Sequence, residues 1–397
     1  MQNFLGRLGL KAGLAFTVCL AVLLGAVLPL MPSVANAQSS GDDTGTLEKI
    51  YQQVNPSVVN IQVTIPSTSN LQGLQPFNPN PFGAPTPPAG GQFELAEGSG
   101  FVYDTKGDLV TNAHVVQDAT KITVSFADDN SMNAKVVGVD LDSDIAVIKI
   151  DAGNEKLSPL TLGDSDKLVV GQRAIAIGNP FGYTGTMTQG IISGLGRSLE
   201  GQRSAGQGSS YLIPQVIQTD ASINPGNSGG VLLDINGNVI GVTTAIESQV
   251  RQSSGVSFAV PSNIVKKVAD TLIKSGKMDH AYLGIAGTTL DLDLDQLDGL
   301  QPNTHGVLVR DVTPDGPAAA AGLKPSTTTK QLDGQPIKVG GDIIVGIDGQ
   351  PVNRFEDLLA YLFVKAEPGQ KIALKVLRDG QSIDVTVTLT ARPATTS

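Results

Sequence analysis

The chain has 397 residues, which is long enough for two or three domains, each with its own core. It contains 46 glycines and 23 prolines, and few segments have apolar residues at the spacing of a long amphipathic helix. The composition therefore favours β-structure with many turns. The formal net charge is −10, and Lys and Arg do not cluster. Nucleic acid is therefore not expected as a partner, because phosphate binding needs clustered basic residues.

Residues 1–37 have the features of an export signal. Basic residues precede an uncharged apolar run, residues 12–31, and Ala35-Asn36-Ala37 is a small-residue cleavage site. The run is long enough to span a membrane, so it is either removed or kept as a tether. Export to the periplasm or cell envelope is expected in both cases. The single cysteine, Cys19, lies inside the run, so the mature chain is expected to lack disulfides and a thiol nucleophile.

A first domain is predicted over residues 46–276. Short segments of alternating apolar and polar residues follow one another in two series, before Ile150 and between Leu168 and Val260, as in small antiparallel barrels. Residues 65–95 are Pro-rich and are predicted to form a long flexible loop, and the polar, Gly-rich residues 198–210 a second one. Residues 262–275 repeat apolar side chains at helical spacing, with Ser262 as the expected cap.

Candidate catalytic residues appear in three separate stretches. Ser228 is flanked by glycines in the stretch Ile223 to Gly230, where glycine allows backbone N–H groups to turn toward a ligand and cradle an oxyanion. His114 follows an expected strand end, and Asp144 directly precedes an apolar strand. The order histidine, aspartate, serine is that of the two-barrel serine proteases.

Several alternatives compete with these assignments. His280 and His305 are interpreted as surface or capped histidines, and Asp140 and Asp142 compete with Asp144. The Gly-x-Ser-x-Gly pattern around Ser228 is also typical of α/β-hydrolases, where the serine lies between a strand and a helix and precedes the acid and the histidine. Here an Asn-Gly hairpin signal follows the serine, which argues against that fold.

Residues 98–276 resemble the protease domain of the HtrA (DegP/DegS-like) serine proteases. The matching stretches are GSGFVYDTKGDLVTNAHVV, SDIAVIKI, AIGNPFG, SGLGR, IQTDASINPGNSGG and GVSFAVPS. The resemblance implies a mainly β fold, a chymotrypsin-like double β-barrel, with His114 as base, Asp144 as orienting acid and Ser228 as nucleophile. It also implies an oxyanion hole at Gly226, Asn227 and Ser228, and an apolar S1 pocket for small or medium aliphatic residues. The residues expected to line that pocket are Ile223, Val256, Ser257 and Phe258.

Residues 281–391 resemble a single PDZ domain, with the pieces in the order found in HtrA proteins. The stretch Tyr282, Leu283, Gly284 and Ile285 corresponds to the carboxylate-binding loop. Such domains bind C-terminal peptides by adding a strand at a sheet edge. Residues 324–339 are longer than the usual connection at that point, so the geometry of this segment is not given by the resemblance.

The resemblance further implies assembly as a trimer or larger homo-oligomer and activation by bound peptide. Arg197, in SGLGR, matches the arginine of the loop that reports PDZ occupancy. The expected function is an exported, ATP-independent serine endopeptidase that degrades or processes misfolded envelope proteins, with no metal or cofactor. Two alternatives remain: a peptide-binding adaptor or chaperone with the protease domain as scaffold, and a signalling protease tethered by residues 12–31.

Overall fold

The structure is a computed structural model that describes residues 43–66, 93–153, 155–180, 185–206, 209–244 and 255–393. The predicted export segment and the centre of the Pro-rich loop lie outside the described residues.

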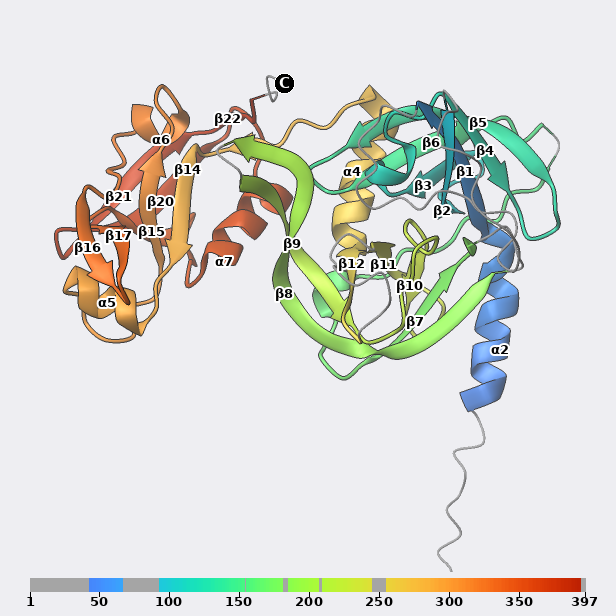
Figure 1. The fold of residues 1–397 in the computed structure, drawn as a ribbon, viewed down its shortest axis with the longest axis horizontal. Coiled ribbons are helices and arrows are strands. Elements are labelled where there is room, and N and C mark those ends of the chain that lie inside the picture. The colour runs from blue at the N-terminus through green and yellow to red at the C-terminus, as the bar shows by residue number, and fades with distance from the viewer. Residues whose placement is uncertain are drawn as a thin grey trace, which may run out of the picture. The chain divides into compact units, whose positions relative to one another are not determined.

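The first barrel closes six antiparallel strands in the order β1-β2-β3-β6-β5-β4 (Figure 1). Its strands are β1 (Val58–Pro66), β2 (Phe93–Val102), β3 (Asp108–Thr111), β4 (Lys121–Ser125), β5 (Ser131–Asp140) and β6 (Ile145–Ile150). Alternate residues of β1, from Val59 to Ile65, are buried in one apolar cluster with residues of the other strands. The alternation of apolar residues in the sequence therefore marks the barrel interior.

The second barrel repeats this plan in the order β10-β11-β12-β9-β8-β7. Its strands are β7 (Arg173–Gly178), β8 (Thr186–Gly206), β9 (Ser209–Thr219), β10 (Val231–Leu233), β11 (Val239–Thr244) and β12 (Ser257–Pro261). The predicted Asn-Gly turn joins β10 to β11: Gly237 has φ 78°, and the backbone N–H of Asp234 bonds the carbonyl of Asn238 at 3.0 Å.

Two predicted loops are wrong in extent. Residues 198–206 and 209–210 belong to strands β8 and β9, which pair into one long hairpin. Ile65 and Pro66 continue β1, and β2 begins at Phe93, so the ends of the predicted 65–95 loop pair with each other as strands. Polar, Gly-rich segments have weak intrinsic strand preference, but pairing with a neighbouring strand overrides it.

Short helical elements precede the barrels, connect their strands, join the two barrels and follow them. They are α2 (Asp43–Val54), η1 (Asn55–Ser57), α3 (Ala113–Val116), η2 (Ser165–Lys167) and α4 (Ser262–Ser275). Helix α4 has the predicted range and ends at Gly276, which has the left-handed φ of 73°. The predicted cap is wrong: Pro261 is the N-cap residue, and the Ser262 hydroxyl donates to the carbonyl of Gly163 at 2.7 Å.

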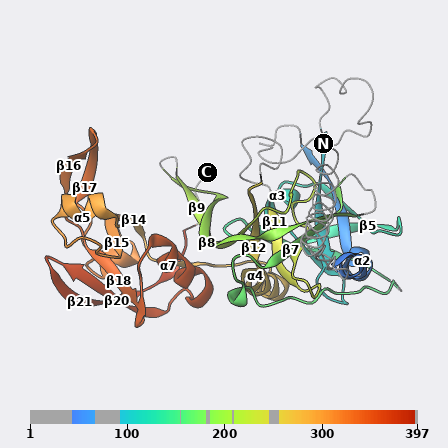
Figure 2. The same cartoon turned by 90° about the horizontal axis from the view of Figure 1, so that it is seen from below.

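The last region, from residue 281 onward, has a sheet of its own in the order β14-β15-β18-β20-β21, with β19 paired to β18. The strands of the whole region, including the separate pairs β13-β22 and β16-β17, are β13 (Ala281–Tyr282), β14 (Ile285–Thr289), β15 (Val307–Val312), β16 (Thr328–Leu332), β17 (Gln335–Val339), β18 (Ile343–Ile347), β19 (Gln350–Pro351), β20 (Lys371–Arg378), β21 (Gln381–Thr388) and β22 (Thr390–Ala391). Its helices are α5 (Leu292–Asp298), α6 (Pro317–Ala320), α7 (Phe355–Ala360) and the π-helical turn η4 (Tyr361–Lys365). The unusually long connection forms the β16–β17 hairpin beside α5 (Figure 2).

The predicted fold class, a double β-barrel followed by one smaller β-rich domain, is confirmed. Over the residues that the structure describes, no helix is both long and apolar enough to cross a membrane.

Candidate active site

The first barrel brings His114 and Asp144 into contact at its rim. His114 lies in α3, directly after β3, and Asp144 directly precedes β6, which pairs with β3. Nδ1 of His114 lies 2.9 Å from both carboxylate oxygens of Asp144, and the backbone N–H of His114 donates to Oδ1 at 3.1 Å. The side chains are buried, with Asp144 at 0% exposure. This contact orients the imidazole and leaves its other nitrogen, Nε2, for a second partner.

Asp144 itself sits in a strained and firmly held turn. Its φ is +56°, a left-handed conformation that costs energy in a residue with a Cβ. Its backbone carbonyl accepts bonds from the N–H of Ala113 at 3.1 Å and from Nδ2 of Asn112 at 2.9 Å. From the second barrel, the hydroxyl of Thr244 donates to Oδ2 at 3.1 Å. Neighbouring elements therefore fix the carboxylate that faces the imidazole.

Ser228 lies between β9 and β10 of the second barrel, in a loop whose glycines are needed for its shape. Gly226 and Gly229 have φ of +92° and +86°. A Cβ at Gly229 would lie 2.1 Å from the carbonyl oxygen of Ser99, so no larger residue fits there. Within the described ranges, neither the N–H of Gly226 nor that of Ser228 donates a hydrogen bond, so both donors are available for a ligand oxygen.

The nucleophile loop and the His114 element adjoin each other at Gly98. A Cβ on Gly98 would touch the side chain of Val115 at 2.7 Å and the carbonyl of Ser228 at 3.1 Å. Among the described residues, no hydrogen bond joins Nε2 of His114 to Oγ of Ser228. Catalytic hydrogen bonds are often long in ligand-free sites and tighten when substrate binds, so this geometry is compatible with a resting site.

Buried hydroxyls that the sequence analysis did not single out hold the nucleophile loop. The hydroxyl of Ser99 donates to the carbonyl of Gly226 at 2.7 Å, and the hydroxyl of Thr243 donates to the carbonyl of Asn227 at 2.6 Å. Ser99 stands between two glycines in the GSGF stretch, which the alternating pattern marks only as a strand. The bond from Ser99 to Gly226 joins residues 127 positions apart in the sequence, and local sequence patterns do not encode such a contact.

The residues predicted to line a specificity pocket lie in different elements and differ in burial. Ile223 is buried in the apolar core of the second barrel, and Ser257 and Phe258 begin β12, opposite Thr219 and Gln218 of β9. Val256 is 50% exposed. Their role in substrate selection stays a prediction.

Arg197 lies on the exposed face of the β8–β9 hairpin, opposite Val216. A Cβ on Gly194 would lie 3.1 Å from its Nε, so the side chain folds back over the hairpin. Helix α7 of the last region packs against β8 and β9, and a Cβ on Gly196 would lie 3.6 Å from Nη2 of Arg354 at the start of α7. The arginine predicted to sense peptide thus stands one residue from a contact with the last region.

The predicted carboxylate-binding loop lies where the chain enters the last region's sheet. Gly284 has φ +80°, and its carbonyl accepts a bond from the N–H of Thr313 at 2.9 Å. The carbonyl of Leu283 accepts a bond from the N–H of Ala318 at 3.0 Å. Tyr282 and Thr313 join their hydroxyls at 2.9 Å, and Ile285 begins β14. β14 lies at the edge of its sheet, and α7 packs beside it.

A second histidine–carboxylate pair lies close to the first and corrects the interpretation of His280. His280 is only 4% exposed, and its Nε2 lies 2.9 Å from both carboxylate oxygens of Asp140. Next to it, Nη1 of Arg392 pairs with Asp142 at 2.9 Å. His280 is therefore a buried hydrogen-bonding partner of Asp140 rather than a surface residue, whereas His305 is exposed as predicted.

Asp140, Asp142 and His280 also satisfy the spacing of a metal site, since their ligand atoms lie within 4.8 Å of one another. Protein groups already occupy these carboxylates: the Ser143 hydroxyl donates to Asp140, and Arg392 pairs with Asp142. A cation would have to displace them, so we interpret the group as an ion-pair cluster.

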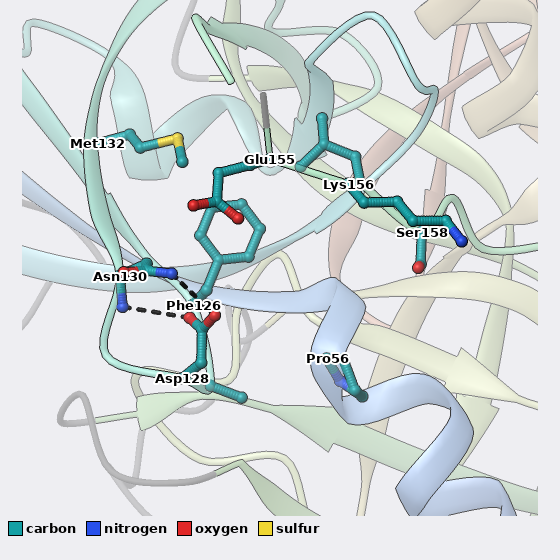
Figure 3. A pocket seen from close by; sticks show the side chains of 10 residues that line it. Pro56, Phe126, Asp128, Asn130, Met132, Glu155, Lys156 and Ser158 are labelled. Atoms are coloured by element: carbon teal, nitrogen blue, oxygen red, sulfur yellow. Dashed lines mark hydrogen bonds between the residues drawn. The ribbon is translucent and has the colours of Figure 1, made fainter. Parts of the chain in front are cut away.

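A cavity of about 330 Å³ opens elsewhere on the first barrel, around the β4–β5 turn (Figure 3). Asn130 donates to Asp128 there, through its backbone N–H at 3.1 Å and its side chain at 2.9 Å. Apolar side chains, among them Phe126 and Met132, also line it. His114, Asp144 and Ser228 do not line it, so it is separate from the candidate active site.

Comparisons with known proteins agree with this architecture. The Trypsin-like peptidase domain family matches residues 98–242, and the PDZ domain family matches residues 281–389. The chain is 45% identical over 296 residues to "Protease Do-like 1, chloroplastic" of Arabidopsis thaliana, covering 75% of this chain and 64% of that protein. It is 35% identical to "Periplasmic pH-dependent serine endoprotease DegQ" of Escherichia coli strain K12, covering 94% of this chain and 77% of that protein. A solved structure, "HtrA-type protease AlgW with decapeptide", superposes with a TM-score of 0.65 at 34% identity, over 88% of this chain and 99% of that one.

A trypsin-like double barrel with a PDZ domain defines a serine endopeptidase equipped with a peptide-binding module. The chain belongs to the HtrA family of DegP-like serine endoproteases.

Proposed function

We propose that the chain is an exported, ATP-independent endopeptidase that cleaves misfolded proteins of the cell envelope through Ser228, His114 and Asp144. The observation that carries this proposal is the buried His114–Asp144 pair, together with an adjoining serine loop whose Gly226 and Ser228 N–H groups donate no hydrogen bond within the described ranges. Relatives named as periplasmic serine endoproteases support the compartment and the endopeptidase activity.

In this mechanism each group has one task. His114 takes the proton of the Ser228 hydroxyl as the oxygen attacks the scissile carbonyl, and later gives that proton to the leaving amine. Asp144 keeps the imidazole in the correct tautomer and stabilises the imidazolium. The N–H groups of Gly226 and Ser228 bind the oxyanion, and one such donor is worth roughly 2.7–4 kcal/mol of transition-state stabilisation. Water then releases the acyl group by the same steps.

Specificity and regulation follow from the neighbouring segments. Ile223 and the residues Val256, Ser257 and Phe258 form an uncharged S1 pocket, so cleavage occurs after small or medium aliphatic residues. C-terminal peptides bind between the free edge of β14 and α7, and their binding reaches the protease through the contact of α7 with the β8–β9 hairpin that carries Arg197. Solved relatives bound to a tripeptide and a decapeptide support peptide binding. The active assembly is a homotrimer or a larger homo-oligomer.

Cleavage of an unfolded protein such as casein by the mature chain tests the proposal. The Ser228→Ala variant is expected to lose cleavage while keeping the wild-type unfolding temperature, because one buried hydroxyl is removed without a change in packing. An adaptor with a protease scaffold would instead bind casein equally well and show no serine-dependent cleavage in the wild type.

Two further measurements separate the finer parts of the proposal. Arg197→Ala is expected to lower stimulation by C-terminal peptides and to spare basal cleavage; equal stimulation would remove that role. N-terminal sequencing of the exported protein is expected to begin after Ala37, and an intact residue 1 would favour the tethered form.

A further inference from the structure

Ser99 connects the first barrel to the nucleophile loop through its backbone N–H and its hydroxyl, and every polar atom that it has is hydrogen-bonded. Its backbone N–H donates to the carbonyl of Ser228 at 2.7 Å, and its hydroxyl donates to the carbonyl of Gly226 at 2.7 Å. The same hydroxyl accepts the backbone N–H of Asn179 at 2.8 Å, and its carbonyl accepts the hydroxyl of Thr111 at 2.7 Å. Ser99 lies in β2 and is 0% exposed, so water does not replace any of these bonds.

These bonds determine which way the peptides of the nucleophile loop face. In a trans peptide the C=O and the following N–H point in opposite directions. With the Gly226 carbonyl held by Ser99, the N–H of Asn227 points away and bonds the carbonyl of Asn224 at 2.9 Å. The Asn227 carbonyl is held by Thr243, so the N–H of Ser228 points to the opposite side. The carbonyls of Gly226 and Asn227 are thus both held by buried hydroxyls, and holding the second one keeps the N–H of Ser228 on the opposite side.

The Ser99 hydroxyl also holds the segment Asn179–Pro180, which packs against Gly226. Gly226 is pressed against Pro180, since a Cβ on Gly226 would lie 2.7 Å from the Cβ of Pro180. The preceding residue, Asn179, is held on both sides by neighbours in the first barrel: its N–H bonds Ser99, and its carbonyl accepts Nδ2 of Asn60 at 2.8 Å. Asn60 and Ser99 stand opposite each other in the β1–β2 pairing. A buried hydroxyl can donate and accept a hydrogen bond at once. The single hydroxyl of Ser99 therefore links both the Gly226 loop and the Asn179 segment to the first barrel.

We propose that the Ser99 hydroxyl is a positioning residue that holds the oxyanion-binding loop in its productive shape, by clamping the Gly226 carbonyl and the Asn179 N–H to the first barrel. It acts through Gly226 and does not touch substrate. The inference rests on the proposed function of Ser228 as nucleophile. An alanine at position 99 would leave a buried carbonyl and a buried N–H without partners, and the loop would relax toward conformations that satisfy them elsewhere.

The test compares the full mature chain with Ser99→Ala and with Ser57→Ala as matched control. Ser57 is also buried, at the end of η1 directly before β1, and its hydroxyl also donates to a backbone carbonyl, that of Ser158, away from the nucleophile loop. Steady-state cleavage of one peptide gives kcat and KM, and inhibition by a peptide boronic acid reports on the oxyanion hole, because the boronate adduct places an oxygen there.

We expect Ser99→Ala to lower kcat by about 10- to 100-fold with KM within about twofold, and to weaken boronate inhibition by a similar factor. Ser57→Ala is expected to lower the unfolding temperature comparably and to keep kcat within about twofold of wild type. If Ser99→Ala does not fold, Ser99→Cys keeps the side-chain shape with a weaker donor, and an intermediate loss of kcat is expected.

Three outcomes would overturn the proposal: wild-type kcat in a folded Ser99→Ala variant, a loss confined to KM, or equal losses of kcat in the Ser99 and Ser57 variants. Ser228→Ala in the same assay separates this inference from the one it rests on. Activity that survives Ser228→Ala rejects the proposed nucleophile, whereas an inactive Ser228→Ala beside a fully active Ser99→Ala rejects only the role of Ser99.

Discussion

Two buried histidine–aspartate pairs share a single turn of this protein and differ in what surrounds them. Asp144 faces Nδ1 of His114, and Asp140, four residues earlier, faces Nε2 of His280, each at 2.9 Å. The first pair leaves Nε2 of His114 without a hydrogen bond to any described residue, and the N–H groups of Gly226 and Ser228 likewise donate none within the described ranges. In the second pair the remaining nitrogen, Nδ1, is buried and has no hydrogen-bond partner among the described residues, and the ring lies against Phe363 with centroids 4.3 Å apart.

The comparison shows that a histidine–carboxylate contact does not by itself identify a catalytic site. In both pairs an imidazole nitrogen lies 2.9 Å from a carboxylate oxygen, Nδ1 in the first pair and Nε2 in the second, and the element that carries His114 adjoins the Ser228 loop. The second ties the segment after α4 to the turn that carries Asp144, and Arg392 ties the end of the last region to the same turn through Asp142. The first pair belongs to the site proposed for proton transfer, and the second holds segments of the chain together.

The largest expected difference comes from removing each histidine in turn. His114→Ala is expected to lower kcat by about 10⁴-fold or more, because Ser228 loses its base. His280→Ala is expected to keep kcat within about tenfold of wild type and to lower the free energy of unfolding by about 3–5 kcal/mol, because the carboxylate of Asp140 loses its buried partner.

Peptide cleavage and urea unfolding of the two variants provide the measurements. His280→Gln, which keeps an N–H donor near Asp140, should recover part of the lost stability. The distinction between the pairs fails if His280→Ala abolishes cleavage in a fully folded protein.

A smaller effect on kcat is expected from Thr244. Its hydroxyl, in the second barrel, donates a hydrogen bond to the carboxylate of Asp144. Thr244→Val removes a hydrogen bond to a buried carboxylate and should lower kcat about tenfold, with KM nearly unchanged. Thr219→Val is the control, since its hydroxyl is buried in the same barrel and donates to the carbonyl of Ile191. Equal kcat values in the two variants would show that Thr244 does not hold the catalytic carboxylate.

The smallest effect concerns a contact outside both pairs, the 2.6 Å hydrogen bond from Tyr103 to Asp270 of α4. Burial and this hydrogen bond raise the pKa of Tyr103 above its ordinary value, so the folded protein keeps the phenol proton at a pH where the unfolded chain releases it. Stability from Tyr103 is therefore present below about pH 10 and declines as the pH rises further.

Tyr103→Phe should cost about 1 kcal/mol of unfolding free energy at pH 8, and the gap to wild type should narrow above pH 10. Urea unfolding between pH 8 and 11 measures this gap. A gap that stays constant across that range would mean that the phenol proton is not linked to folding.

The sequence predicted the two barrels, the PDZ-like domain and the contact between His114 and Asp144, because short motifs and strand alternation mark these features locally. It missed Ser99, the hydroxyls of Thr243 and Thr244, and the burial of His280. Their partners lie far away in the chain: His280 meets Asp140 across 140 positions, and no periodicity encodes that contact. The β8–β9 hairpin was missed for a related reason, since its polar, Gly-rich strands are stabilised by each other rather than by their own composition.

Active-site labelling tests the central claim most directly. A fluorophosphonate reacts with a serine only where a base activates it, so mass spectrometry of the labelled mature protein should find the adduct on Ser228. The account predicts that labelling disappears in Ser228→Ala, falls strongly in His114→Ala, and persists in His280→Gln. An adduct on another serine, or a labelling rate that does not depend on His114, would contradict it.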